Sequence, residues 1–376
     1  MPELEHSTGS DLARPAPPAR PTVCLVLHAY QPPNISDSEV EETVRCVYQP
    51  LMALHAATAT PVTLNVQGCL LPRLQTIRPN FLELLRELAR SRLVEFTTSA
   101  HYHPCLPLLP RNRRKQQIAL NLETIEEILD VRPCGFWPPE LAWSPAMSQQ
   151  LIALDLRWTI VDGSAFVRAW SFEQPSAQGP TALYFSAELM QPYVFASAPD
   201  LIAVPRQHEL SRALFEEDAL MCSDKLDASI EAMRSQARGL ICLATDADRI
   251  APATLRLYER LLRALSEFSD LTTTTMAVEK YPANQTIDLP VWTWRGPLDE
   301  WVRGEGERTL LRELDEAYRR RASLMWGPKD SELAAAVDDS LMRAECSCWL
   351  FWRAPYRFLA EGFALIEHAH RIMDPT

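Results

Sequence analysis

Short runs of mostly apolar residues recur along the chain, and each run is followed by polar or turn-forming residues. Continuous apolar runs of this length are typical of strands that are buried on both faces of a parallel sheet. Two further segments, Thr181–Phe185 and Leu201–Val204, are candidates for one more strand. The clearest runs are Thr22–Leu27, Val62–Val66, Leu93–Thr97, Gly135–Pro138, Trp158–Val161 and Leu240–Ala244.

Segments with helical periodicity separate these runs. In the segment from Arg113 to Leu129, for example, Ile118, Leu122 and Ile125 recur at the spacing of one helix face. Strands and helices therefore alternate with short connections and about seven buried strands in all. This alternation predicts an α/β fold, either a parallel barrel or a doubly wound sheet.

The residues at the strand ends favour the barrel. His28, His103, Glu140, Asp162 and Asp246 each come just after an apolar run. Parallel strands place their carboxyl ends on one face, and active sites of α/β barrels form on that face. We therefore expect these five side chains to lie at the same end of the barrel.

The chain divides into three parts by composition. Residues 1–20 are rich in proline, alanine and charge, which predicts a disordered tail. Residues 21–285 carry the alternating pattern and form the predicted barrel. Residues 286–376 begin with an aromatic segment and continue with three helical stretches, so we expect a C-terminal helical subdomain packed on the barrel.

Composition excludes several classes of function. The net charge is −12 at pH 7, which would repel a phosphate backbone and argues against nucleic acid as a partner. The chain has only 11 glycines and no glycine-rich phosphate loop. Its nine cysteines are scattered and several lie in apolar runs, which indicates free thiols in a reducing cytoplasm. We see no signal peptide and no apolar stretch of membrane-spanning length, so we expect a cytoplasmic protein and no membrane partner.

The segment from Cys134 to Trp143 carries the strongest candidate chemistry. It is an apolar run with one carboxylate, Glu140, between Trp137 and Trp143. An acid after a strand, leading into a helical segment, is the usual place for a catalytic group in α/β barrels. Flat apolar side chains beside a partly desolvated acid suit a group that acts on a sugar ring.

The sequence resembles glycoside hydrolase family 57, from about Thr22 to Met373. The resemblance is strongest at residues 135–140, Gly-Phe-Trp-Pro-Pro-Glu, which are similar to the third motif of the family. The first and second motifs resemble residues 28–32 and the segment that starts at His103-Pro104. The fourth resembles Asp246-Ala247-Asp248 in place of Asp-Gly-Glu, and the fifth resembles Cys346-Ser347-Cys348-Trp349.

The resemblance implies a distorted (β/α)7 barrel followed by a helical region. It also implies a retaining enzyme of the α-amylase, 4-α-glucanotransferase or α-glucan branching type, with no metal and no cofactor. Glu140 would be the nucleophile and Asp246 the acid/base, two carboxylates that such a reaction needs about 5–5.5 Å apart. The expected substrate-binding residues are His28, His103, Trp137, Trp143, Trp349 and Asp248.

This chain departs from the family pattern at three places. Tyr30 stands where the first motif usually has a second histidine, the fourth motif is altered, and Cys348 stands where the fifth motif often has an aspartate. Asp246 could also be a helix cap, because aspartate is common at that position. The tryptophans could simply be core residues.

Two other functions stay open from the sequence. His101 and His103 could be ligands of zinc in a polysaccharide deacetylase, a barrel type that uses histidines and an aspartate around a metal. Against it, the first strand lacks the paired aspartates of such an enzyme. The altered fourth motif also allows a relative that binds glucan without turning it over.

Overall fold

The computed structural model describes residues 20–171, 186–215, 220, 222–351 and 357–374. The predicted tail up to residue 19 and the strand candidate Thr181–Phe185 lie outside these residues. None of the helices in the described part of the chain combines the length and the apolar character that crossing a membrane requires.

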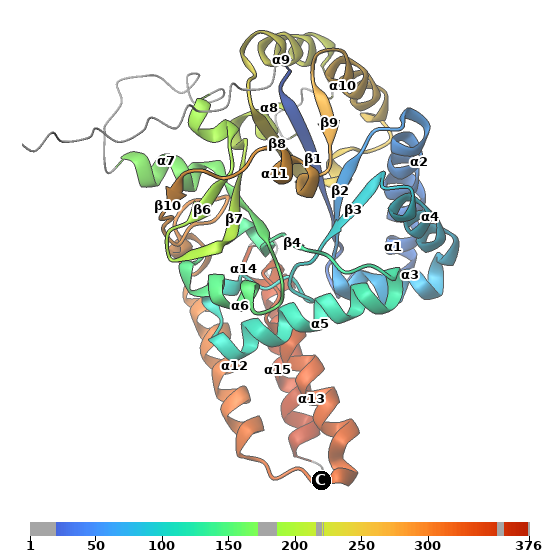
Figure 1. Ribbon diagram of the computed structural model, residues 1–376. Helices are drawn as coiled ribbons and strands as arrows, with labels where there is room; N and C mark the ends of the chain where they lie inside the picture. The colour runs from blue at the N-terminus through green and yellow to red at the C-terminus, as the bar shows by residue number, and fades with distance from the viewer. Residues whose placement is uncertain (1–19, 172–185, 216–219, 221, 352–356, 375–376) are drawn as a thin grey trace, which may run out of the picture.

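Parallel strands surround the centre of the barrel, and helices cover their outer side (Figure 1). Beginning at the first strand and following the backbone pairing, the order around the ring is β1, β2, β3, β4, β5, β7 and β8. These strands are β1 (Thr22–Ala29), β2 (Val62–Val66), β3 (Val94–Thr97), β4 (Gly135–Phe136), β5 (Trp158–Asp162), β7 (Ala198–Arg206) and β8 (Leu240–Asp246). The barrel expected from the sequence is thus confirmed, and Leu201–Val204 lies in its β7 strand.

Two joints of the ring are weak. β3 meets β4 through a single bridged pair, Thr98 and Phe136, which lies outside the regular ladders. β7 meets β8 through the pair Arg206 and Cys242. By contrast, β1 pairs with β8 over seven residues and with β2 over four. The barrel is therefore distorted, and continuous ladders of hydrogen bonds do not close it in the described residues.

Prolines explain why β4 is so short. The predicted strand reached Pro138, but the structure ends β4 at Phe136, before the pair Pro138-Pro139. Proline has no backbone N–H and cannot donate to a ladder. The chain leaves the sheet here and turns across the mouth of the barrel, where Glu140 and Leu141 adopt positive φ angles of 59° and 45°.

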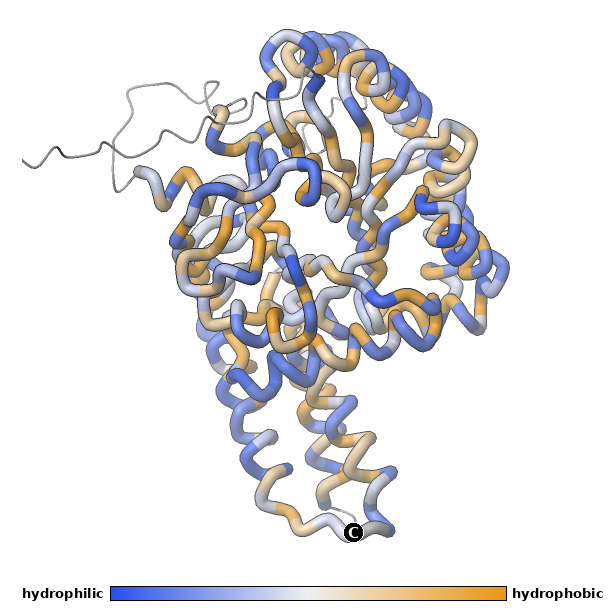
Figure 2. Tube along the Cα trace, viewed as in Figure 1, coloured by the Kyte–Doolittle hydropathy of each residue, from blue (hydrophilic) through white to orange (hydrophobic). Residues whose placement is uncertain are grey.

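The helices of the barrel bury one face and leave the other in solvent. In Figure 2 the outer helices alternate between hydrophilic and hydrophobic positions, as this arrangement requires. Among the described residues these helices are α1 (Asp37–Thr43), α2 (Gln49–Thr58), α3 (Leu71–Ile77), α4 (Pro79–Arg90), α5 (Arg111–Leu129), α6 (Ser148–Ile152), α7 (Gly163–Ser171), α8 (His208–Phe215), α9 (Ser223–Gln236), α10 (Leu255–Phe268) and α11 (Thr274–Lys280).

Three short strands extend the sheet. β6 (Tyr193–Phe195) runs antiparallel to β7, and β10 (Thr286–Ile287) pairs with β6. β9 (Asp270–Thr272) pairs with the start of β1. The sequence did not predict these strands, because two or three residues are too few to show a period.

The last fifth of the chain adds helices that extend away from the barrel in Figure 1. α13 (Ser331–Ala344) and α12 (Glu305–Ser323) both pack against α15 (Arg357–Met373), and α14 (Cys348–Phe351) connects them to the barrel mouth. Their shared apolar core includes Trp301, Trp349 and Ile366. The three predicted helical stretches are therefore present, while the division into a barrel of 21–285 and a subdomain of 286–376 stays a prediction.

Gly135 provides a test of the packing beneath the site. A Cβ atom at Gly135 would lie 2.0 Å from Cζ2 of the buried Trp158 ring, so a side chain here must displace that ring. We expect Gly135→Ala to lower the free energy of unfolding by about 1–3 kcal/mol, measured by urea denaturation.

The control for this test is Gly327→Ala. A Cβ there would meet its nearest neighbour, Oδ2 of Asp330, at 3.4 Å. We expect a change within about 0.5 kcal/mol. Equal effects of the two substitutions would show that Trp158 does not constrain Gly135.

Candidate active site

A cavity of about 260 Å³ lies at the carboxyl ends of the barrel strands. Its walls come from the ends of β1, β7 and β8, from the turn after β4, and from the segments around Trp294 and Cys348. Its lining includes six of the eight predicted site residues: His28, His103, Trp137, Glu140, Asp246 and Asp248. The structure thus brings together side chains that the sequence separates by more than 200 residues.

Glu140 is a buried carboxyl group with both oxygens occupied. Its side chain is 14% exposed. The indole N–H of Trp294 donates to Oε2 at 2.8 Å, and the hydroxyl of Ser347 lies 2.7 Å from Oε1. The backbone holds φ at +59°, a conformation that is costly for a residue with a side chain. Such strain is common where a side chain must be aimed at a reaction.

Burial raises the pKa of Glu140 to about 7. The hydrogen bonds from Trp294 and Ser347 act in the opposite direction, because they stabilise the ionised form, and the negative charge of Asp246 raises the pKa further. A carboxyl group with a pKa near neutrality can exchange protons at the pH where enzymes work.

Asp246 has a different environment. It is the last residue of β8, lines the same cavity as Glu140, and is exposed. Although it occupies the position before a short helical turn, its side chain makes no capping hydrogen bond there. The capping role considered from the sequence therefore finds no support. Asp248, two residues on, is also exposed and lines the cavity.

The two site histidines contact each other. Nε2 of His28 lies 3.1 Å from Nε2 of His103, and their remaining nitrogens contact Asn65 and Ser347. The rings of Trp137 and His28 stack with their centres 5.0 Å apart. Hydrogen bonds from these histidines to sugar hydroxyls, as expected from the sequence, would compete with the contacts they already make.

Trp143 and Trp349 do not line the cavity. Trp143 is completely buried and stacks on Phe195, with ring centres 4.3 Å apart. Trp349 is 2% exposed and donates its indole N–H to the carbonyl of Arg343 at 2.8 Å. These contacts place both side chains in the packed core, whereas the sequence led us to expect that they contact the substrate.

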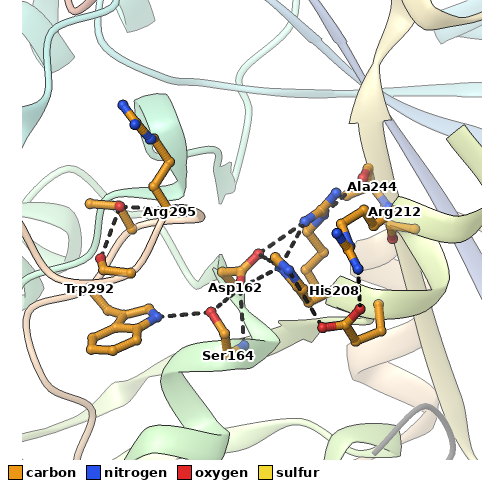
Figure 3. A network of polar contacts seen from close by, with 12 residues as sticks. Asp162, Ser164, His208, Arg212, Ala244, Trp292 and Arg295 are labelled. Atoms are coloured by element: carbon orange, nitrogen blue, oxygen red, sulfur yellow. Dashed lines mark hydrogen bonds and ion pairs between the residues drawn. The ribbon is translucent and has the colours of Figure 1, made fainter. Parts of the chain in front are cut away.

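A second buried network supports one wall of the cavity (Figure 3). Asp162, at the end of β5, contacts the guanidinium of Arg206 at 3.0 Å and the ring of His208 at 2.9 Å. Arg206 lines the cavity and also donates to the carbonyl of Ala244 in β8 at 2.9 Å. Burial alone would raise the pKa of Asp162, but the hydrogen bond and charge of His208 and the charge of Arg206 hold it below its ordinary value. The network fixes β5, β7 and β8 relative to one another.

No metal centre is evident among the described residues. No group of three or more His, Cys, Asp or Glu side chains in that part of the chain has the arrangement of a metal site. Unlike His103, His101 does not line the cavity. The Nδ1 atom of His101 lies 3.4 Å from the hydroxyl of Thr124.

The chain matches the family model "Glycosyl hydrolase family 57" over residues 27–250, more than half of its length. The chain belongs to this family. The matched region contains four of the five motifs predicted from the sequence, and both proposed carboxylates.

Relatives of the chain include proteins named as alpha-amylases and 4-alpha-glucanotransferases. The chain is 27% identical over 143 residues to alpha-amylase 1 of Dictyoglomus thermophilum, a match that covers 38% of this chain and 21% of the amylase. It is 27% identical over 144 residues to the 4-alpha-glucanotransferase of Thermococcus litoralis, covering 38% and 22%. The matches thus span about a fifth of the length of these two relatives.

Solved structures of family 57 share the fold. The GH57 branching enzyme of Thermococcus kodakaraensis superposes with a TM-score of 0.75 at 16% identity, over 94% of this chain and 90% of that chain. A structure named as a polysaccharide deacetylase, from Mycobacterium smegmatis, superposes less well, with a TM-score of 0.50 at 13% identity over 76% of this chain and 99% of that chain.

The structure adds site residues that the sequence did not single out. Ser347 lies inside the fifth family 57 motif, but its position in that motif did not suggest a contact with Glu140. Trp294 lies in the aromatic segment at the start of residues 286–376, and nothing in that segment suggested a contact with Glu140. Tyr30 was noted for its departure from the motif and now lines the cavity, as does Arg206. Arg206 ends an apolar strand, as the recognised site residues do, and that signal could have found it.

Replacing Trp294 tests the environment of Glu140. Trp294→Phe keeps a ring but removes the donor to Oε2, so the ionised form of Glu140 loses one stabilising hydrogen bond. We expect its pKa to rise from about 7 by roughly one unit. The measurement is a 13C NMR titration of the labelled glutamate carboxyl, assigned with Glu140→Gln.

Trp292→Phe is the matched control. The indole N–H of Trp292 donates to Ser164 at 2.8 Å and not to Glu140. This substitution should leave the Glu140 titration where it is. A Trp294→Phe titration that coincides with the unsubstituted protein would contradict the proposed hydrogen bond.

Proposed function

We propose that this protein is a retaining glycoside hydrolase or transglycosylase that acts on α-glucans. The observation that carries the proposal is the meeting of Glu140 and Asp246 on one cavity at the carboxyl end of a family 57 barrel. The names of the amylase and glucanotransferase relatives support an α-1,4-linked glucan, such as glycogen or a maltooligosaccharide, as substrate.

In the proposed reaction Glu140 is the nucleophile. Its carboxylate attacks the anomeric carbon, while Asp246 gives its proton to the oxygen of the leaving sugar. The glycosyl ester on Glu140 is then cleaved by water or by the hydroxyl of another glucan, whose proton returns to Asp246. Water as acceptor gives hydrolysis, and a sugar hydroxyl gives transfer or branching.

The cavity supplies flat apolar surfaces and polar groups for a sugar. Trp137, Trp294 and Phe351 line it together with Arg206 and Asp248. Aromatic faces suit the apolar side of a pyranose ring, and charged groups suit its hydroxyls. Asp246 is exposed, so a bound glucan would cover it and displace water from it, which raises the pKa of a carboxyl group.

A deacetylase is the weaker alternative. Such an enzyme needs histidines free to bind a metal, but both ring nitrogens of His28 and of His103 contact protein atoms. The structural likeness to the deacetylase fold is also lower than that to family 57 enzymes. The other alternative is a relative that binds glucan without turning it over. Product analysis with maltooligosaccharides distinguishes such a protein from an active enzyme.

The direct test uses maltooligosaccharides, with products resolved by size and their anomeric configuration followed by 1H NMR. We expect new chain lengths with retained configuration. Glu140→Gln and Asp246→Asn should each lower kcat by roughly 10³-fold or more, because each removes a group that forms or breaks a bond. Glucan binding without products in the unsubstituted protein would instead indicate the non-catalytic relative.

Glu95→Gln is the matched control. Glu95 is also a glutamate whose pKa is raised by burial, but it lies near the start of β3 and contacts Thr275 and Thr63, away from the cavity. This variant should retain turnover. If it loses activity as Glu140→Gln does, the loss reports general damage rather than catalysis.

A trapping experiment assigns the nucleophile. A fluorinated glucosyl fluoride that slows breakdown of the glycosyl ester should leave a covalent label, located by mass spectrometry of peptides. We expect the label on Glu140. A label on Asp246 would reverse the two proposed roles.

A further inference from the structure

A continuous series of side-chain contacts leads from Glu140 into the wall of the barrel. Oε1 of Glu140 lies 2.7 Å from the hydroxyl of Ser347, which lies 3.0 Å from Nδ1 of His103. Nε2 of His103 lies 3.1 Å from Nε2 of His28, and Nδ1 of His28 lies 2.7 Å from Oδ1 of Asn65. Ser347 and Asn65 are completely buried, and each histidine is no more than 5% exposed.

The direction of these hydrogen bonds is fixed at the Asn65 end. The amide nitrogen of Asn65 contacts the backbone carbonyl of Thr97 at 3.3 Å and its hydroxyl at 3.0 Å. A carbonyl can only accept, so the amide nitrogen must face it and the amide oxygen must face His28. Nδ1 of His28 therefore carries a proton and donates to Asn65.

Each following bond depends on the one before it. A neutral His28 with a proton on Nδ1 has an acceptor at Nε2, so Nε2 of His103 must donate to it. A neutral His103 is then an acceptor at Nδ1, and the hydroxyl of Ser347 donates to it. Ser347 has one proton and has used it, yet its oxygen still lies 2.7 Å from Glu140.

Four hydrogen bonds thus need four protons, while two neutral imidazoles and one hydroxyl supply three. The fourth proton sits either on Glu140, which then donates to Ser347, or on His103, which then donates from both nitrogens. In the second case the Ser347 hydroxyl turns to Glu140. Nδ1 of His103 lies 3.6 Å from Oε1 of Glu140, close enough for an ion pair.

We propose that Glu140 and His103 share one proton through the hydroxyl of Ser347, with His28 and Asn65 fixing the direction of transfer. The step is balanced: the carboxyl proton of Glu140 passes to the oxygen of Ser347 as the hydroxyl proton of Ser347 passes to Nδ1 of His103. No bond other than these O–H and N–H bonds changes, and the total charge stays constant. Ser347 is a positioning residue that acts through Glu140.

The surroundings decide where the proton rests. Burial opposes charge on both groups: it raises the pKa of Glu140 to about 7 and lowers that of His103. Burial therefore favours the neutral pair over the ion pair. Other titratable or charged groups also face these side chains. Those near the Glu140 carboxyl are Asp246, Arg295, Cys105 and Cys348. Tyr30 stacks on His103, and Asp248 lies near His28.

The consequence for catalysis rests on the proposed function. A nucleophile must be ionised when it attacks, and this arrangement ionises Glu140 without releasing a proton to solvent. Once the glycosyl ester forms, Glu140 is neutral and Asp246 has lost its proton to the leaving sugar. The proton held by His103 then balances the new charge on Asp246, so the net charge of the site is the same before and after bond formation.

The proton shared by Glu140 and His103 is tested by NMR on the full chain, without substrate. Glutamate carboxyl carbons and imidazole nitrogens are labelled and titrated, with Glu140→Gln and His103→Gln used for assignment. Two groups that share a proton titrate as a unit, so both signals should move in the same macroscopic steps. His28 should carry its proton on Nδ1 throughout. A separate single step for each residue, or His28 protonated on Nε2, would overturn the proposal.

Substitutions of Ser347 give the second arm. In Ser347→Ala we expect Glu140 and His103 to titrate separately. In Ser347→Thr, which keeps the hydroxyl, we expect the two residues to titrate together, as they do in the unsubstituted protein. The acidic limb of the pH profile of kcat/KM should move to higher pH by roughly one to two pH units in Ser347→Ala. This shift corresponds to the loss of one hydrogen bond to a charged group. Ser347→Thr should restore it.

The two arms distinguish the two proposals. A purely structural role of Ser347 would lower kcat without moving the acidic limb, and that result would overturn the shared proton. Absence of glucan turnover in the unsubstituted protein would contradict the proposed function, whereas the NMR titrations would still decide whether the proton is shared.

Discussion

The structure around the cavity depends on a single requirement: a carboxyl group buried at the mouth of the barrel must find hydrogen-bond partners. Glu140 finds them in Trp294 and Ser347, which follow it by 154 and 207 residues. The backbone N–H of Trp294 also contacts the carbonyl of Glu140 at 3.3 Å. The segments after the barrel thus complete the environment of a residue in the turn that follows a strand of only two paired residues. This explains how a turn with two positive φ angles keeps one conformation.

The two carboxyl groups of the cavity differ in a way that bears on mechanism. A retaining reaction needs an ionised nucleophile and a protonated acid. In the free protein burial favours the protonated form of Glu140, while Asp246 is exposed to water. Substrate must therefore help to set the working charge state. A glucan bound over Asp246 would displace water from this carboxyl group and so favour its protonated form. A protonated Asp246 no longer places a negative charge near Glu140, which favours the ionised form of Glu140, because the negative charge of each group raises the pKa of the other.

Much of the fold and part of the site could be predicted from the sequence. The strand Val62–Val66 has the predicted bounds, because its apolar run ends at turn residues on both sides. Glu140 and Asp246 could be placed at strand ends, since a strand end is a local feature. Ser347 and Trp294 could not be linked to Glu140, because only the tertiary fold brings them within hydrogen-bond distance. Trp143 and Trp349 were indistinguishable in sequence from Trp137, since an aromatic side chain in a cavity wall and one in a core follow the same apolar pattern.

Two of the three departures of this chain from the family pattern, Tyr30 and Cys348, contact each other, which explains why they can occur together. The hydroxyl of Tyr30 lies 3.2 Å from the thiol of Cys348 and 3.1 Å from that of Cys346. In the pattern that the sequence resembles, these positions carry a histidine and an aspartate, a pair able to bear opposite charges. Here both are neutral, because burial raises the pKa of Tyr30 and the contact with Cys346, together with burial, raises that of Cys348. Two neutral groups at these positions add no charge beside Glu140 and His103, so they leave the proposed proton balance between these two residues undisturbed.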